Sequence, residues 1–216
     1  AADVAQAETS SEDALAQADR HLVQQDLDAA HELLSLLEGS APVLWRRARL
    51  CESRAQEIKR REGVAKCRHS AAARAQLLEG LSHARAAIEA DGDCGACHMW
   101  YACMLEATAR FEGTRAEILA AVEIKKHFER AAELEPSDPW AKHYLGIWFF
   151  EVAGVSWTTR KLASALFAEP PTASMEQAIH ELLAAERLAP DFSARNPLYL
   201  GRSYLQLGQK EEARTW

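Results

Sequence analysis

Small residues that recur at fixed places along the chain are the feature that most constrains its fold. Leu145-Gly146 and Leu200-Gly201 are each followed, three residues after the glycine, by an aromatic side chain. Glycine or alanine lets two helices approach closely, and larger side chains fill the space around the contact. Units of about 34 residues with this pattern are typical of tetratricopeptide repeats, which are pairs of helices. The pattern therefore predicts stacked helical hairpins.

Helix exits set the length of each repeat. They fall near Pro42, Gly92, Pro136 and Pro190, so the spacings of 50, 44 and 54 residues exceed a standard repeat. We predict an all-α, tetratricopeptide-like superhelix of about five antiparallel helical hairpins with extended inter-helix inserts. It forms one domain over 1–216. The predicted hairpins span about 11–42, 43–92, 95–136, 139–190 and 194–216.

Helix-start signals accompany several of these hairpins. Ser10-Ser11 precedes two acidic residues, and Ser137-Asp138-Pro139 and Asn196-Pro197 combine a capping side chain with a proline at the first helical position. The aromatic residues of the first helices, such as Trp100, Tyr101 and Trp148, are expected in the core.

Composition excludes several classes of protein. The net charge of −7 argues against a nucleic-acid binder, and no apolar run approaches the roughly 18–20 residues that span a bilayer. Five cysteines, an odd count, favour a reducing compartment over a disulfide framework. The last residues read as the middle of a helix, so we expect a longer natural chain. Any membrane anchor is expected outside these residues.

Several segments resemble the regulator of microtubule dynamics family. The likeness covers most of 43–216. It is most specific in the insert that follows the first helix of the fourth predicted hairpin. The segments that carry it are Leu44–Arg49, Cys97–Ala102, Ile124–Pro136, Trp140–Phe150, Val155–Trp157, Arg160–Phe167 and Pro170-Pro171.

The resemblance implies a tetratricopeptide-like α-domain without enzymatic activity. Family members are associated with microtubules and the spindle. One member tethers the outer mitochondrial membrane to the endoplasmic reticulum, and its helical domain is implicated in phospholipid binding and transfer. The family label does not choose among microtubule, lipid and assembly roles.

Cys94, Cys97 and His98 match the pattern of c-type haem attachment, and the two cysteines also match a redox pair. We reject both interpretations, because the motif lies at a hairpin junction and no strand precedes it. Zinc binding is a third interpretation, with Cys51, Cys67 or His69 as further ligands. Structural zinc sites usually need two paired ligand clusters, and this sequence lacks them. Neither a phosphate loop nor a nucleophile motif is present. We predict no enzyme, no cofactor and no metal, and expect most of the eight histidines at the surface or in the groove.

The basic segment, residues 43–74, carries ten arginines and lysines against three glutamates, a net of +7 in an acidic chain. Such a segment attracts acidic partners such as tubulin tails or phospholipid headgroups. A solvated helix face with internal ion pairs is the alternative. The candidate partner-binding residues here are Arg46, Arg49, Arg60 and Arg61.

The insert, residues 154–174, is the second candidate surface. Trp157, Leu162, Leu166 and Phe167 recur at helical spacing, with Arg160 and Lys161 opposite. They predict an apolar pocket for an acyl chain or a partner helix, or a simple cover over the core. Trp157, Arg160, Lys161 and Phe167 are its candidate partner-binding residues.

The sequence thus favours a non-catalytic scaffold that holds an acidic or amphipathic protein partner, on the cytoplasmic side and associated with microtubules or mitochondria. Two alternatives stay open. One is a phospholipid-binding or transfer module at mitochondrial contact sites. The other is a structural subunit of a large mitochondrial or microtubule-associated assembly.

Overall fold

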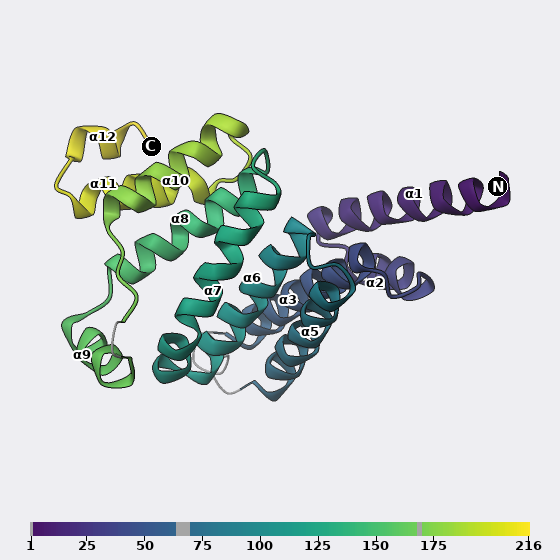
Figure 1. The fold of residues 1–216 in the computed structure, drawn as a ribbon, viewed down its shortest axis with the longest axis horizontal. Coiled ribbons are helices and arrows are strands. Elements are labelled where there is room, and N and C mark those ends of the chain that lie inside the picture. The colour runs from purple at the N-terminus through teal and green to yellow at the C-terminus, as the bar shows by residue number, and fades with distance from the viewer. Residues whose placement is uncertain (1, 64–69, 168–169) are drawn as a thin grey trace. The chain divides into compact units, whose positions relative to one another are not determined.

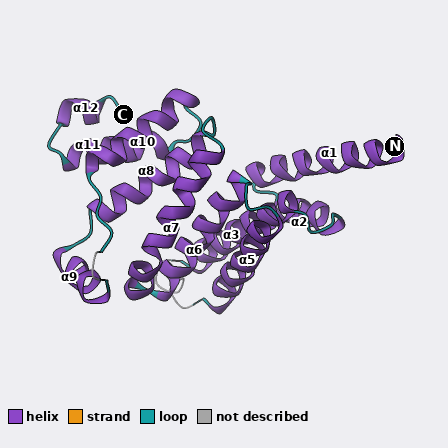
Figure 2. Cartoon of the chain, viewed as in Figure 1, coloured by secondary structure: helices purple, strands orange, loops and turns teal. Residues whose placement is uncertain are grey.

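The structure is a computed structural model that describes residues 2–63, 70–167 and 170–216, with side chains from residue 11 onward in these ranges. Within them every regular element is a helix and no strand occurs (Figure 2). The predicted all-α fold class of helical hairpins is confirmed. The chain divides into two compact units, Ala1–Phe111 and Glu112–Trp216. None of the described helices is long and apolar enough to cross a membrane.

The first unit is built mostly from long helices (Figure 1). They pack through faces rich in buried alanine. α3 packs along α5, and α1 packs against α2 and α3. Gly80 on α5 is essential to this arrangement, because a Cβ there would lie 2.9 Å from the Cβ of Cys51 on α3. Its helices are α1 (Ala2–Gln24), α2 (Leu27–Leu36), α3 (Ala41–Glu62), α5 (Ala71–Ala90) and α6 (Gly95–Glu112, which ends at the unit boundary).

The second unit repeats the same device. α8 packs against α10 and α7, α10 against α11, and α11 against α12. Gly146 on α8 faces Leu182 on α10, and a Cβ on the glycine would come within 2.7 Å of the leucine Cγ. α9 lies in the insert between α8 and α10 and contacts α7 (Figure 1). Its helices are α7 (Thr114–Leu134), α8 (Pro139–Ala153), α9 (Trp157–Leu166), α10 (Met175–Leu188), α11 (Arg195–Gln206) and α12 (Lys210–Arg214).

The predicted helix starts have mixed outcomes. Asp138 caps α8, since its Oδ1 accepts a hydrogen bond from the Trp140 N–H at 2.9 Å, with Pro139 at the first helical position. Ser10 and Ser11, in contrast, lie inside α1, which begins at Ala2. Asn196 lies inside the first turn of α11 with its side chain buried, because that side chain serves tertiary hydrogen bonds instead of a cap.

Candidate functional site

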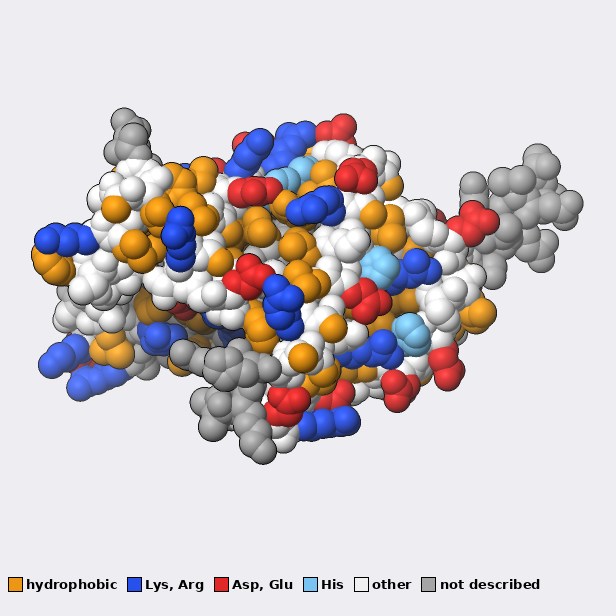
Figure 3. Space-filling model, turned by 90° about the horizontal axis from the view of Figure 1, so that it is seen from below, with side chains coloured by type: hydrophobic (Ala, Val, Ile, Leu, Met, Phe, Trp, Pro, Cys, Tyr) orange, Lys and Arg blue, Asp and Glu red, His pale blue; other side chains and the backbone are white. Residues whose placement is uncertain are grey.

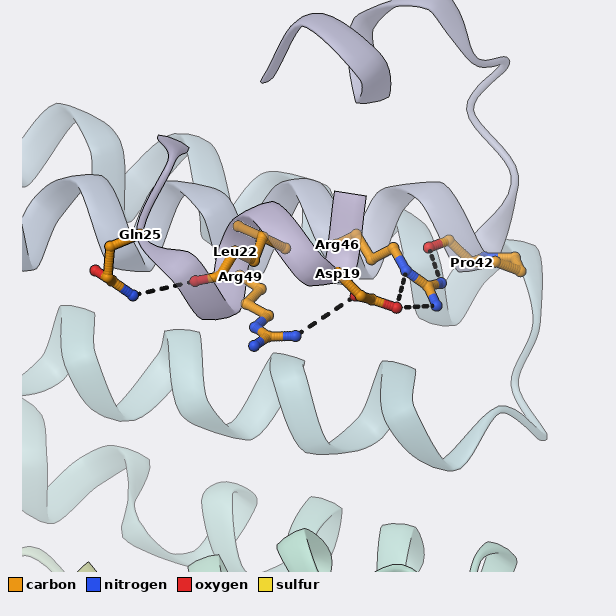
Figure 4. A network of polar contacts seen from close by, with 6 residues as sticks. All are labelled: Asp19, Leu22, Gln25, Pro42, Arg46 and Arg49. Carbon is orange, nitrogen blue, oxygen red and sulfur yellow. Dashed lines mark hydrogen bonds and ion pairs between the residues drawn. The ribbon is translucent and has the colours of Figure 1, made fainter. Parts of the chain in front are cut away.

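Arg46 and Arg49 are held within the first unit by Asp19 of α1 (Figure 4). Arg46 donates from Nε at 3.0 Å and from Nη2 at 2.7 Å to Asp19 Oδ2, and from Nη1 to the Pro42 carbonyl at 2.9 Å. The Nη1 of Arg49 lies 3.5 Å from Asp19 Oδ1. The Arg46 side chain is only 14% exposed. Both arginines therefore tie α1 to α3, and their binding of a partner stays a prediction.

Removing this anion gives a first testable prediction. Asp19→Ala should lower the free energy of unfolding by about 1–2 kcal/mol, because the half-buried guanidinium of Arg46 loses the acceptor of two N–H groups. Urea denaturation followed by circular dichroism measures the loss. Asp13→Ala, an exposed aspartate on the same helix, is the matched control. Equal effects of the two substitutions would contradict the structural role of Asp19.

Two further bases of the basic segment also bond inside the first unit. Arg47 Nη2 donates to the carbonyls of Leu34 and Leu37 at 2.8 and 2.9 Å, so it satisfies the C-terminal end of α2. Arg54 Nη2 lies 3.6 Å from a carboxylate oxygen of Asp28. Part of the predicted positive charge therefore bonds to other helices of the first unit, which neither interpretation of this segment predicted.

The last turn of α3 presents two exposed arginines of the basic segment. The side chains of Arg60 and Arg61 are 80% and 73% exposed, and both lie beside Glu57 one turn earlier. Cations are stabilised at this end of a helix by its dipole. On the face drawn in Figure 3, acidic and basic side chains are interspersed instead of forming a block of one sign. Lys66 and Arg68 lie outside the described residues.

The insert forms a short amphipathic helix, α9. Ser156 caps it by accepting from the Thr159 N–H at 3.2 Å. On the surface of α9, Lys161 Nζ lies 4.0 Å from the centroid of the Trp157 ring, a cation–π contact, and Trp157 is 68% exposed. Phe167 ends the helix and is half-buried.

A cavity of about 310 Å³, here called the insert pocket, lies where the insert folds back beside α7 and the end of α8. Arg160 is the charged group of its lining, and its Nη2 donates to the Val155 carbonyl at 3.2 Å. The apolar part of the lining comes from Ile118, Val152, Val155, Ala163, Pro170 and Pro171. The insert pocket thus combines apolar walls with one guanidinium and the hydroxyl side chains of Thr159, Ser164 and Thr172.

The apolar face predicted for the insert does not line this pocket. Trp157, Leu162, Leu166 and Phe167 are absent from the lining, whereas Arg160, which was predicted on the opposite face, is part of it. Their binding of a partner stays a prediction. The wall that α9 provides consists of Thr159, Arg160, Ala163 and Ser164, which share one helical face at spacings of one, three and four residues. Ala163 and Ser164 of this wall line the same cavity as Pro170 and Pro171 of the returning chain. Ala163-Ser164 a few residues before Pro170-Pro171 was the signal that could have found it.

His143 is an exception to the expectation that most of the histidines lie at the surface or in the groove. It is fully buried, and its Nδ1 bonds to Asn196 Oδ1 at 3.0 Å. Asn196 Nδ2 donates to the Leu182 carbonyl and to Glu186, so Oδ1 must be the acceptor and His143 Nδ1 carries the proton. His143 Nε2 is buried without a hydrogen-bond partner. Burial lowers the pKa of His143 to about 4, so it joins α8 to α11 as a neutral ring.

Cys94 and Cys97 form a bond that the cysteine count argued against. The structure joins them in a disulfide at the start of α6, where three residues of separation bring the two Cα atoms to 5.3 Å. His98 is buried, and its Nε2 lies 2.9 Å from the Gly92 carbonyl. Both sulfurs therefore belong to the disulfide, and the His98 ring bonds to a carbonyl six residues earlier in the chain. Cys51 and Cys103 are buried, and Cys67 and His69 lie outside the described residues.

A family model of Regulator of microtubule dynamics protein 1-3 matches residues 14–216. The chain belongs to this family. Regulator of microtubule dynamics protein 1 of Mus musculus is 35% identical over 207 residues, which cover 95% of this chain and 65% of the mouse protein. The Homo sapiens protein 1 is 39% identical over 140 residues, which cover 65% of this chain and 45% of the human protein.

Regulator of microtubule dynamics protein 3 of Mus musculus is 37% identical over 139 residues, which cover 64% of this chain and 30% of that protein. The chain thus spans less than two thirds of the curated relatives of this family. Among solved structures, the crystal structure of MamA aligns with 92% of this chain and 88% of its own, at 13% identity and a TM-score of 0.48.

Proposed function

We propose that this member of the regulator of microtubule dynamics family is a non-catalytic binding module for an amphipathic protein segment that carries acidic groups. The insert pocket is the observation that supports the proposal. Its apolar walls suit aliphatic side chains of a partner, and Arg160 in its lining suits a carboxylate. The names of the relatives, which refer to microtubule dynamics, are consistent with a role in holding another protein.

The size of the pocket favours a protein segment over a whole lipid. Ligand pockets usually measure about 300–1,000 Å³, and the insert pocket lies at the lower end of that range. A cavity of this size suits a few apolar side chains better than the two acyl chains of a phospholipid. The exposed Trp157–Lys161 pair on α9 adds an aromatic ring and a cation on the surface of the same insert.

Filling the pocket should abolish binding of such a segment. Ala163→Trp places an indole in the cavity, and Arg160→Glu reverses its charge, so each should weaken binding of a designed leucine- and glutamate-faced helix at least tenfold. Fluorescence anisotropy of the labelled peptide measures the affinity. Ala165→Trp, the same substitution at an exposed position of α9, is the control and should bind normally. Equal binding by the Ala163→Trp and Ala165→Trp variants would sink the pocket hypothesis.

The exposed end of α3 gives a separate prediction for microtubules. Arg60→Glu with Arg61→Glu should greatly weaken co-sedimentation with microtubules, because both side chains are open to an acidic tubulin tail. Binding of the unaltered chain should fall as salt rises. The control reverses Arg115 and Arg187, two bases outside the basic segment. Unchanged sedimentation of the Arg60/Arg61 variant would remove this surface from the account.

A phospholipid-binding or transfer module at mitochondrial contact sites is the second candidate, and the apolar lining of the insert pocket is the observation that favours it. Its test uses vesicles of phosphatidylcholine with phosphatidylserine and a fluorescent phospholipid. Transfer that Ala163→Trp abolishes and Ala165→Trp preserves would support a lipid ligand. Peptide binding without lipid transfer would support the protein partner.

A further inference from the structure

Three potential metal ligands converge between α3 and α5 in the first unit. Glu79 and His83 lie one turn apart on α5, and Cys51 faces them from α3. The thiol sulfur, a carboxylate oxygen and an imidazole nitrogen all lie within 4.8 Å of one another. Gly80 makes the convergence feasible, because the absence of a Cβ lets α5 approach the Cys51 side chain.

The cluster opens into a cavity. Cys51, Glu79 and His83 line a space of about 220 Å³ that also borders on His31 of α2. One water occupies roughly 30 Å³ in the liquid, so the cavity has room for an ion and a bound water. Cys51 is buried, His83 is half-buried and Glu79 is exposed, which leaves an entry path from solvent.

We propose that Cys51, Glu79 and His83 bind a divalent metal ion of the zinc class. A thiolate, an imidazole and a carboxylate together suit zinc, whereas calcium and magnesium take oxygen ligands. Two ligands about 2.1 Å from a tetrahedral ion are about 3.4 Å apart. His83 Nε2 and Glu79 Oε1 are 3.9 Å apart, so small side-chain rotations suffice.

The fourth position would be filled by water or by His31, which lines the same cavity. On binding, the Cys51 thiol gives its proton to solvent and its sulfur forms a bond to the metal, with no change of oxidation state. Cys94, Cys97 and His98 are not part of this site, and the sulfurs of Cys94 and Cys97 are joined in a disulfide.

Two arginines border the cavity, and their charge has to be compatible with a cation. Arg47 directs Nη2 to the carbonyls of Leu34 and Leu37, and Arg54 lies 3.6 Å from Asp28. Binding adds the two positive charges of the ion and releases one proton, so the charge of the three ligands with their ion changes from −1 to zero. The occupied site therefore carries no net charge beside the two guanidinium groups.

Cobalt titration tests the site, because a cobalt–thiolate bond gives a charge-transfer absorption band. The full chain should bind one equivalent of Co²⁺ with such a band, and Zn²⁺ should displace it. Cys51→Ala should lose the band, while Glu79→Gln and His83→Gln should weaken binding at least tenfold. Cys103→Ala and His180→Gln, at residues outside the cluster, are the controls and should keep both band and affinity.

The absence of a band in the unaltered chain, or a band that survives Cys51→Ala, would overturn the proposal. If the Cys51 variant fails to fold, the other two variants decide, since their side chains are partly exposed. Unchanged affinity in Glu79→Gln and His83→Gln would equally overturn it. A readout of metal binding is independent of the proposed partner-binding function.

Discussion

Replacing Gly146 by valine should destabilise the second unit by about 3 kcal/mol. A Cβ at this position would lie 2.7 Å from Cγ and 3.0 Å from Cδ2 of Leu182, and 3.1 Å from the Leu182 backbone nitrogen. The backbone atom cannot rotate away, and Leu182 is fully buried, so α8 and α10 would have to move apart. Overpacking a close-packed core costs about 1–3 kcal/mol, and the β-branched side chain places this change at the upper end.

Urea denaturation measures the effect of Gly146→Val, with the slope of the transition as a check that the same unfolding event is compared. Gly39→Val is the matched control, because the nearest atom to a Cβ at Gly39 is the end of the Leu44 side chain at 3.8 Å. It should change stability by less than about 1 kcal/mol. A Gly146→Val protein as stable as the control would show that the α8–α10 crossing does not depend on a small residue.

Acidification should destabilise the protein through His143. Burial lowers the folded-state pKa of this ring from 6.5 to about 4, so its contribution to stability is fully present above about pH 6.5. That contribution is lost progressively as pH falls from about 6.5 towards 4, since the unfolded state then binds a proton that the folded state does not. A shift of this size corresponds to about 3 kcal/mol.

Comparing the unaltered chain with His143→Gln separates the effect of His143 from the effect of carboxylates that titrate in the same pH range. Glutamine does not titrate, and its amide can still donate to Asn196 Oδ1. The free energy of unfolding should therefore depend less on pH between 7 and 4 in the variant. His180→Gln, on an exposed ring, is the control and should behave like the unaltered chain. Identical pH dependence in all three proteins would contradict the neutral, buried state of His143.

The sequence predicted the helical hairpins well because their signal is local. Leu145-Gly146 marks a crossing where two helices touch, and Asp138-Pro139 marks a helix start. These patterns depend on steric fit and on hydrogen bonds between near neighbours, which adjacent residues report directly. The fold class followed from them.

The contacts between distant residues could not be predicted in the same way. Asp19 and Arg46 are 27 positions apart, and His143 and Asn196 are 53 apart, so nothing in either neighbourhood indicates the pairing. Asn196 looked like a helix cap because its short amide suits that role. The fold instead uses the amide to satisfy a buried histidine, which tertiary packing alone decides.

The lining of the candidate site in the insert could not be predicted from local patterns either. Its amphipathic pattern predicted a pocket, but the pattern favours large apolar residues as the lining. The structure lines the pocket with Ala163 and the returning prolines, and leaves Trp157 exposed. Which face of a short helix turns inward depends on the chain that folds back over it.

Methyl nuclear magnetic resonance with the designed leucine- and glutamate-faced helix tests the central claim, that the insert pocket holds an amphipathic partner. With labelled Ala163, Val155 and Ala165 methyl groups, nuclear Overhauser effects from the peptide leucines should reach Ala163 and Val155 but not the exposed Ala165. Overhauser effects at Ala165 alone, or none at any of the three methyl groups with the peptide bound, would contradict it.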